Sequence, residues 1–306
     1  MVAASRVLFL GVSTSASSVH RAMPGWAAAL GVDVTLEGVD LPIGAPAAAY
    51  ATVIDRIHRD PRILGMVVTT HKAALWSACE TSFAQVTSLA AMLREVGGVS
   101  RVSGTLTADA PDVRSVGRAA LRLLTDERWA TGPRHALILG AGGAGLSLAY
   151  NLSDRLPEIA AERVVLTELD PARVTTVRTI VAGWDRADAI TVDLAAPGIN
   201  DRLVAAAPPG SLIVNASGAG KDRPGSPLAP ATRLPKRSIY WEFNYRGELP
   251  LLGQARSQAA SEDLLVVDGR DYLVCGWMEA LCFVVGRQPT DELVGQFDLA
   301  AQAAGV

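Results

Sequence analysis

The 306-residue chain is long enough to form two domains of ordinary size. It carries 28 Lys and Arg against 31 Asp and Glu, a net charge of −3, so no basic field is available to neutralise a nucleic-acid backbone. Apolar residues make up 49% and charged residues 19% of the chain, and no apolar run approaches the roughly 18 residues of a membrane span. We expect a globular cytoplasmic protein that binds neither nucleic acid nor membrane.

The cysteines and the first residues favour no special class of protein. Cys79, Cys275 and Cys282 form no Cys-x-x-Cys motif and no His/Cys pair with metal-binding spacing. We therefore expect buried thiols, with no disulfide framework and no metal site. The opening apolar run is short and ends at Gly11, which indicates a buried strand and not a secretory signal.

Short apolar runs alternate along the chain with segments of helical periodicity, which predicts an α/β protein with a largely parallel sheet. In the first half, strands are expected at residues 7–10, 32–36 and 64–69, and helices at 20–30 and 47–59. A helix at 116–124 is expected between the halves. In the second half, strands are expected at residues 135–139, 163–167, 190–193, 211–215, 238–243 and 264–267. Their spacing suits the crossover connections of parallel strands.

A glycine-rich segment follows the strand expected at 135–139 and leads into a helical pattern. Glycines at such a junction let the backbone approach a pyrophosphate, whose charge meets the N-terminus of the helix. The pattern therefore predicts a Rossmann dinucleotide-binding domain. The candidate cofactor-binding residues are Gly140, Gly142, Gly143, Ala144 and Gly145. The alternative is a tight turn between a strand and a helix that binds nothing.

Acidic residues at the end of the next strand support the dinucleotide site. Glu168 and Asp170 stand where an acid accepts hydrogen bonds from the ribose hydroxyls of the adenosine half. An ionised Glu168 would repel a 2′-phosphate. The sequence therefore favours NAD over NADP as the cofactor.

Three segments of the first half carry side chains that suit a small-molecule site. A serine-rich loop with Ser15 and Ser17 could bind a carboxylate, although serines there more often cap a helix. Lys72 follows the end of a buried strand, where the loops of α/β proteins bind ligands. The alternative is that Lys72 is an ordinary surface lysine. Asp112 precedes the helix between the halves and on its own would be a helix cap. His71 fits a ligand pocket and a solvent-facing loop equally well.

In this order and spacing the segments resemble the shikimate and quinate dehydrogenase family over nearly the whole chain. In the first half, the family's Asn-Val-Thr-x-Pro-x-Lys motif is similar to Val68-Thr69-Thr70-His71-Lys72, its Gly-Ala-Val-Asn-Thr motif to Gly97-Gly98-Val99-Ser100-Arg101, and its Asn-Thr-Asp-x-x-Gly motif to Ala110-Pro111-Asp112 with Gly117. In the second half, its Val-Asn-Ala-Thr loop is similar to Val214-Asn215-Ala216-Ser217, and its Tyr and Thr-Pro-Leu-Leu segment to Tyr245 with Pro250-Leu251-Leu252. Ser100 replaces the family's asparagine, and Gly276 stands in place of its glutamine. The resemblance therefore implies the fold and the cofactor. Because of these two replacements, we expect the substrate to be a cyclic polyol or keto acid other than, or in addition to, shikimate.

The resemblance implies a division into two domains. Residues 1–114 and 268–306 would form an N-terminal α/β substrate domain to which C-terminal helices return, and residues 115–267 the Rossmann domain. It also assigns substrate-binding roles to Ser15, Ser17, Thr69, Ser100 and Tyr245. Asn215, Ala216 and Ser217 are placed beside the nicotinamide.

The implied reaction is reversible hydride transfer between a nicotinamide cofactor and a hydroxyl or ketone. Reduction of a ketone leaves charge on oxygen, which must take up a proton, and oxidation returns that proton to a base. Lys72 would be the general acid and base, and Asp112 would orient it.

Two other functions stay open. The chain could be a catalytically silent NAD-binding regulatory protein, because several polar groups of the family's pocket are absent. It could also resemble the methylene-tetrahydrofolate dehydrogenases, which share a two-domain plan and an active-site lysine. A homodimer also stays possible from the sequence, because large apolar side chains can lie in a core or at an interface between subunits. The residues concerned are Trp26, Trp76 and Trp129.

Overall fold

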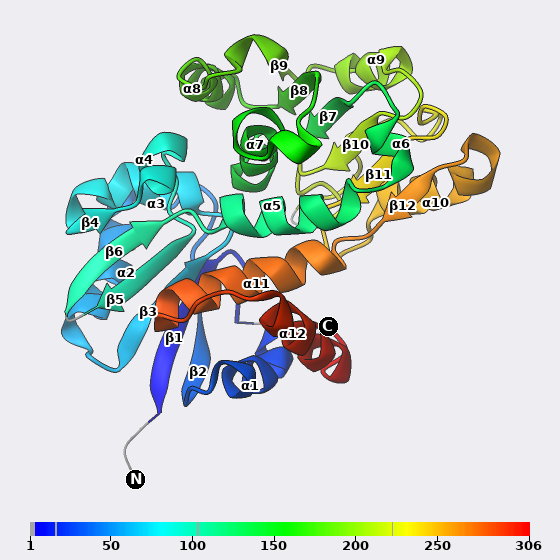
Figure 1. The fold of residues 1–306 in the computed structure, drawn as a ribbon. Coiled ribbons are helices and arrows are strands. Elements are labelled where there is room, and N and C mark those ends of the chain that lie inside the picture. Colours follow the sequence, from blue (N-terminus) through cyan, green and yellow to red (C-terminus); the bar gives the residue numbers. More distant parts are fainter. Residues whose placement is uncertain (1–3, 16, 103, 222) are drawn as a thin grey trace. The chain divides into compact units, whose positions relative to one another are not determined.

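The computed structural model describes residues 4–15, 17–102, 104–221 and 223–306. The chain divides into two compact units (Figure 1). The first consists of Met1–Ser115 and Val274–Val306, and the second of Val116–Leu273. These divisions come one residue and six residues after the predicted boundaries at 114 and 267. The substrate and cofactor roles of the two units stay predictions.

The first unit contains a six-stranded mixed sheet in the order β2-β1-β3-β5-β6-β4. Its strands are β1 (Ser5–Gly11), β2 (Val34–Asp40), β3 (Ile63–Val68), β4 (Gln85–Val86), β5 (Gly98–Val102) and β6 (Thr105–Asp109). β1 pairs with β2 and β3 in parallel, whereas β5 runs antiparallel to both β3 and β6. β4 pairs with β6 in parallel, so β5 is the one strand of this described sheet that runs against the others. The sheet is therefore largely parallel, as predicted, and the hairpin of β5 and β6 is the part that the sequence did not predict.

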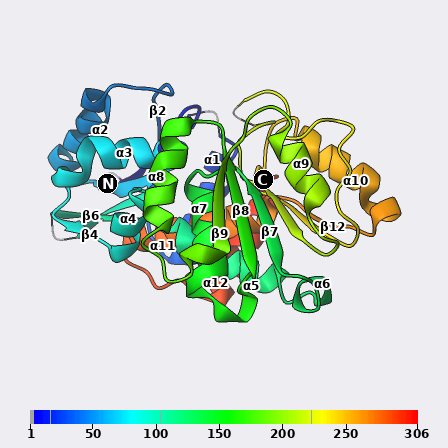
Figure 2. The same ribbon diagram turned by 90° about the horizontal axis from the view of Figure 1, so that it is seen from above.

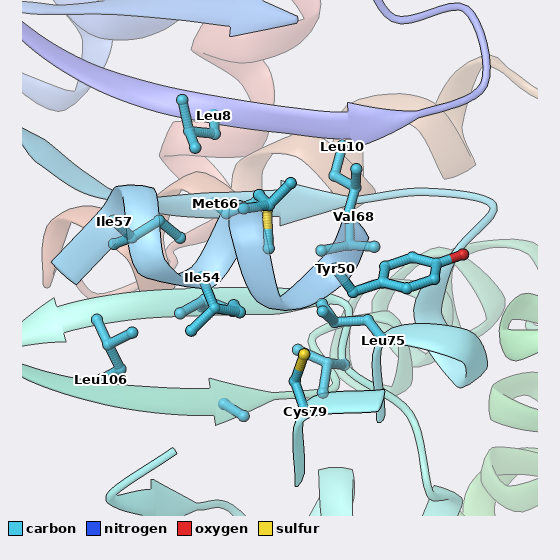
Figure 3. Close-up of a cluster of buried hydrophobic side chains, with 14 of the residues drawn as sticks. Leu8, Leu10, Tyr50, Ile54, Ile57, Met66, Val68, Leu75, Cys79 and Leu106 are labelled. Atoms are coloured by element: carbon cyan, nitrogen blue, oxygen red, sulfur yellow. The ribbon is translucent and has the colours of Figure 1, made fainter. Parts of the chain in front are cut away.

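Helices pack around this sheet. They are α1 (Val19–Leu30), α2 (Ala47–Arg59), α3 (Lys72–Cys79), α4 (Ser88–Leu93), the start of α5 (Asp112–Leu123), most of α11 (Arg270–Val285) and α12 (Asp291–Ala303). α2 buries Tyr50, Val53, Ile54 and Ile57, the spacing of one helical face. Figure 3 shows this face against Leu8, Leu10, Met66 and Val68 of the central strands. These contacts hold the loop that follows β3 on a rigid core.

The C-terminal helices belong to the first unit, as predicted. Figure 1 shows α12 beside α1, and Trp26 Nε1 donates to the carbonyl of Phe297 at 3.0 Å. The Trp26 ring stacks on Phe297, with centroids 5.4 Å apart, and on Trp277 at 5.3 Å. Trp26 is thus a core residue and not an exposed anchor for a partner.

The second unit is a parallel sheet in the order β12-β11-β10-β7-β8-β9. The strands are β7 (His135–Leu139), β8 (Arg163–Glu168), β9 (Ile190–Leu194), β10 (Leu212–Asn215), β11 (Ile239–Glu242) and β12 (Leu265–Val267). The order reverses at β7, as in a doubly wound Rossmann sheet. This confirms the predicted Rossmann architecture.

Helices cover both faces of this second sheet. The set comprises the rest of α5, α6 (Glu127–Ala130), α7 (Gly143–Tyr150), α8 (Pro171–Val181), α9 (Ile199–Ala206) and α10 (Pro250–Glu262). Figure 2 shows α7 and α8 on one face and α9 and α10 on the other. Short 3-10 turns lie at Glu80–Ser82, Pro157–Ile159 and Ala187–Ala189, and a π-helical turn at Asn151–Arg155.

All three cysteines lie in the described ranges and are buried thiols, as predicted. Trp129 is also a core residue, and its Nε1 donates to the carbonyl of Ile159 at 3.3 Å. Across the described ranges, no helix combines the length and the apolar character needed to cross a bilayer.

Candidate active site

Lys72 and Asp112 form an ion pair in the first unit. Lys72 begins α3 directly after the loop that follows β3, and Asp112 begins α5. The Lys72 ammonium contacts Oδ2 of Asp112, and the two side chains are only 16% and 15% exposed. The structure therefore brings together the two residues that the sequence singled out 40 positions apart. Their catalytic roles stay predictions.

Backbone hydrogen bonds of Gly97 connect the ends of β3 and β6, the strands that precede α3 and α5. Val68 N donates to the Gly97 carbonyl at 2.9 Å, and Gly97 N donates to the Asp109 carbonyl at 2.9 Å. A Cβ atom on Gly97 would come within 3.0 Å of Pro111 Cδ. The absence of a side chain at Gly97 thus lets the start of α5 approach the end of β3.

His71, next to Lys72, is buried and fully hydrogen-bonded. Its Nε2 lies 3.0 Å from the Leu41 carbonyl, which can only accept, so Nε2 carries the proton. Nδ1 therefore accepts from the Tyr50 hydroxyl at 3.0 Å. Burial raises the pKa of Tyr50, which keeps it a donor. The solvent-facing alternative for His71 is wrong, because the residue is only 3% exposed.

A second charged cluster, which the sequence analysis missed, lies at the start of α5. Asp109 is fully buried and accepts from Thr87 Oγ1 at 2.6 Å and from the Arg114 guanidinium. Arg114 Nε also lies 3.3 Å from Glu279 Oε2 on α11. Although burial opposes it, pairing with both carboxylates raises the pKa of Arg114. Arg114 thereby fixes the helix turn that carries Asp112.

The serine-rich loop is organised by Asp40 at the end of β2. The Asp40 carboxylate accepts from the Thr14 amide, from Thr14 Oγ1 at 2.6 Å and from the Ser15 amide at 3.4 Å. Although burial opposes it, these hydrogen bonds hold the pKa of Asp40 below its ordinary value. The Ser17 hydroxyl is buried without a hydrogen-bond partner in the part of the chain that the structure describes. Ser18 precedes α1 and makes no side-chain cap.

The other predicted substrate-binding residues lie in different surroundings. Thr69 is half-buried, and its amide donates to the Leu10 carbonyl at 2.9 Å. Ser100 is buried and donates its hydroxyl proton to the Val284 carbonyl at 3.1 Å, which gives it a structural role. Tyr245 belongs to the second unit, where the Lys221 ammonium lies 5.3 Å from its ring centroid.

Three glycines of the second unit's nucleotide-binding pattern differ in their surroundings. Gly140 has φ +111°, and a Cβ there would lie 2.6 Å from backbone atoms of Ala216. A Cβ on Gly145 would lie 2.0 Å from the Gly140 carbonyl oxygen, so Gly145 allows α7 to pack closely. A Cβ on Gly142 would meet nothing within 4 Å. Space is therefore open where a pyrophosphate approaches the N-terminus of α7.

A pocket of about 260 Å³ lies beside these glycines at the carboxyl ends of the strands. The residues lining it include Gly140, Gly142, Glu168, Leu169, Ala195, Asn200, Ala216, Ser217 and Arg223. This lining matches the predicted cofactor residues Gly140, Gly142, Glu168, Ala216 and Ser217. The predicted Gly143, Ala144 and Gly145 form the first turn of α7. The arrangement fits a dinucleotide, as an acid, a glycine turn and a helix N-terminus share one pocket.

The two predicted ribose acids have different positions. Glu168 accepts from the Ala141 amide at 3.3 Å and from the Leu169 amide at 2.7 Å, so its carboxylate lies against the glycine turn. Asp170 instead accepts from the Ala172 amide at 2.9 Å and caps α8. Asp170 is not among the described residues that line the pocket. Glu168 thus lines the pocket and Asp170 caps α8, and the ribose-binding role of either acid stays a prediction.

Asn215 belongs to a buried network that the sequence analysis missed. Its Nδ2 donates to Glu242 Oε2 at 2.9 Å, and its Oδ1 accepts from Ser217 Oγ at 2.7 Å. The fully buried Glu242 also accepts from Tyr240 OH at 2.6 Å and from Asn244 N and Nδ2 at 2.9 and 2.8 Å. Burial raises the pKa of Glu242 against the effect of these donors. The network holds the loop that packs on Gly140; its signal was an acid in an otherwise apolar strand.

Comparison with known proteins gives matches among solved structures only. No protein-family model and no curated protein matches the chain. The quinate dehydrogenase from Corynebacterium glutamicum in complex with NAD superposes with a TM-score of 0.74 at 20% identity, over 98% of this chain and 99% of that chain. The shikimate 5-dehydrogenase from Thermus thermophilus in complex with shikimate has a TM-score of 0.70 at 23% identity, over 99% and 100%.

A protein named for a different substrate has the same architecture. The ligand-free 5-ketofructose reductase of Gluconobacter sp. strain CHM43 has a TM-score of 0.65 at 16% identity, over 98% of this chain and 99% of that chain. At such identities the similarity establishes the architecture and not the substrate. The chain has the fold of the shikimate and quinate dehydrogenases.

Proposed function

We propose that the protein is a nicotinamide-dependent oxidoreductase of the shikimate and quinate dehydrogenase type, which acts on a hydroxyl or ketone of a small cyclic polyol acid. The observation that carries the proposal is the Lys72–Asp112 ion pair, which the first residues of α3 and α5, 40 positions apart in the sequence, form in a chain with this fold. Other support comes from the nucleotide-type pocket of the second unit.

Lys72 supplies the proton chemistry in this proposal. An ammonium can donate a proton to the oxygen of a ketone as it is reduced, and the amine can take the proton back in the opposite direction. The Asp112 carboxylate holds the amine at one position, because both side chains are largely shielded from water. The nicotinamide cofactor, when bound, supplies the hydride acceptor or donor.

NAD is the proposed cofactor. The Glu168 carboxylate lies 3.3 Å from the Ala141 amide at the glycine turn, and its charge would oppose a 2′-phosphate on the adenosine ribose. The similar quinate dehydrogenase was solved in complex with NAD, whereas a Thermus thermophilus shikimate 5-dehydrogenase was solved with NADP(H) and shikimate.

The substrate is proposed to differ from shikimate or to include more than shikimate. The Ser100 hydroxyl is committed to the Val284 carbonyl, and Gly276 offers no side chain. A site that lacks hydrogen-bonding groups for a substrate hydroxyl loses discrimination for that hydroxyl. The same observations favour the second candidate function, a protein that binds NAD and catalyses nothing.

One experiment separates these functions. The purified protein is incubated with NAD or NADP and with shikimate, quinate, aminoshikimate or a keto sugar, and the nicotinamide absorbance is followed; NAD binding is measured by calorimetry. NAD binding together with turnover of a cyclic polyol acid supports the proposal. NAD binding with no turnover across the panel supports the silent protein, and absence of NAD and NADP binding contradicts both.

A further inference from the structure

Arg223 is a cation in the wall of the nucleotide pocket for which the sequence analysis gave no role. It follows a tight loop after β10, in which Gly220 N donates to the Arg223 carbonyl at 2.7 Å and Arg223 N to the Gly218 carbonyl at 3.3 Å. Its side chain is exposed and lines the pocket. Among the described residues, no acidic side chain forms an ion pair with Arg223.

One hydrogen bond anchors the guanidinium beside the glycine turn. Arg223 Nη2 donates to the Ser217 carbonyl at 2.7 Å. Ser217 is in turn a close neighbour of Gly140, since a Cβ on Gly140 would lie 2.7 Å from Ser217 Cα. A guanidinium has five N–H donors in a rigid fork, so donors remain after this bond. Arg223 is therefore held on the β10 side of the turn whose other side carries Glu168.

The charges of the pocket suit a ligand with an anionic centre. Glu168 directs its carboxylate to the amides of Ala141 and Leu169, next to the place where ribose hydroxyls bind in this fold. A dinucleotide pyrophosphate carries two negative charges, whereas the N-terminus of α7 offers only the partial charge of the helix dipole. Among the described residues that line the pocket, Arg223 is a cation that can neutralise more of the negative charge of the pyrophosphate.

We infer that Arg223 binds the pyrophosphate of the dinucleotide and thereby sets the affinity of the second unit for its cofactor. The inference rests on the proposed function, since it takes the ligand to be a nicotinamide dinucleotide. It adds a binding residue outside the glycine turn, supplied by the loop that the buried Asn215 network supports.

The test is calorimetric and does not depend on enzyme activity. NAD, ADP-ribose and adenosine are titrated into the wild-type chain and into Arg223→Gln, Arg223→Lys and Arg202→Gln. Arg202 is an exposed arginine of α9 that does not line the pocket, so its loss removes the same charge from the same unit. Thermal unfolding of each variant reports whether the fold is retained.

Arg223→Gln should weaken NAD and ADP-ribose binding about 10- to 100-fold, the usual effect of losing a charge-assisted hydrogen bond. Adenosine binding should change less than about twofold, Arg202→Gln should bind like the wild type, and Arg223→Lys should fall between. NAD binding by Arg223→Gln within twofold of the wild type would overturn the inference. An equal loss of adenosine affinity would also overturn it.

The result distinguishes this inference from the proposed function. A wild-type chain that binds no dinucleotide contradicts both, whereas a chain that binds NAD equally with and without Arg223 contradicts the inference alone. If Arg223→Gln lowers the melting temperature, Arg223→Lys alone is used, because it retains the charge and loses the fork.

Discussion

The hydroxyl of Tyr50 donates a hydrogen bond to Nδ1 of His71, immediately before Lys72 in the chain. Both residues are almost completely buried, at 2% and 3% exposure, and the opposite ring nitrogen is bound by the Leu41 carbonyl. Lys72 therefore directly follows a residue, His71, whose two ring nitrogens are both hydrogen-bonded.

Tyr50→Phe removes the donor and leaves Nδ1 of His71 buried without a partner. An unsatisfied buried acceptor costs about 1 to 3 kcal/mol, so the free energy of unfolding should fall by that amount. Urea denaturation followed by fluorescence measures it. An unchanged midpoint and slope would show that the hydrogen bond contributes nothing to the core.

Arg114→Met removes the guanidinium that pairs with the buried carboxylates of Asp109 and Glu279. Removing one member of a buried charged cluster costs about 3 to 5 kcal/mol, so this variant should be among the least stable. Arg59→Met serves as the control, because Arg59 pairs with Asp55 at 3.6 Å on the surface. Equal stability of the two variants in urea would contradict the role given to Arg114.

Glu242 gives the second unit a pH dependence of known sign. Burial raises its pKa in the folded protein above the ordinary value of 4.5, so between that pH and the raised pKa the folded state binds more protons than the unfolded state. Its contribution is fully present below pH 4.5 and is lost as the pH rises through the raised pKa.

Glu242→Gln removes this titration, and the free energy of unfolding of the wild type minus that of the variant should decrease with rising pH. Urea denaturation at a series of pH values measures it. A difference that is constant or increases over this window would contradict the account.

Gly142→Ala should affect NAD binding, whereas Gly140→Ala should affect the stability of the fold. A methyl group at Gly142 meets nothing within 4 Å, so the fold should be retained while NAD affinity falls about tenfold or more through loss of the close approach. A methyl group at Gly140 is strained by φ +111° and by contact with Ala216, so it should lower the melting temperature. Calorimetry and thermal unfolding test the pair; normal NAD binding by Gly142→Ala would exclude a pyrophosphate at this turn.

The parts of the molecule that were predicted from the sequence depend on local patterns. The apolar run 135–139 and the glycines after it gave β7 and the start of α7, because a strand, a turn and a helix each leave a signal in consecutive residues. α2 likewise agreed with its predicted bounds, since Tyr50, Val53, Ile54 and Ile57 follow a helical period. Lys72 and Asp112 were singled out through a resemblance in motif order.

The parts that were missed depend on contacts between distant residues. The β5–β6 hairpin contains Gly98, Ser100 and Arg101, whose alternation is too weak to mark strands without their partners. Arg114 looks like a surface helical residue until Asp109 and Glu279, which is 165 positions away, are seen beside it. Glu242 left a weak signal, an acid at the end of an apolar strand, but the hydrogen bond from Asn215, 27 positions away, is seen only in the folded chain.

The central claim is tested most directly by replacing the amine at position 72. With the substrate that the activity panel identifies, Lys72→Met should lower kcat about 10²- to 10⁴-fold, while the dissociation constant for NAD measured by calorimetry changes less than about twofold. Lys236→Met, at an exposed lysine of the second unit, is the control and should leave both values unchanged. A Lys72→Met protein that turns over substrate at the wild-type rate would contradict the assignment of proton transfer to the Lys72–Asp112 pair.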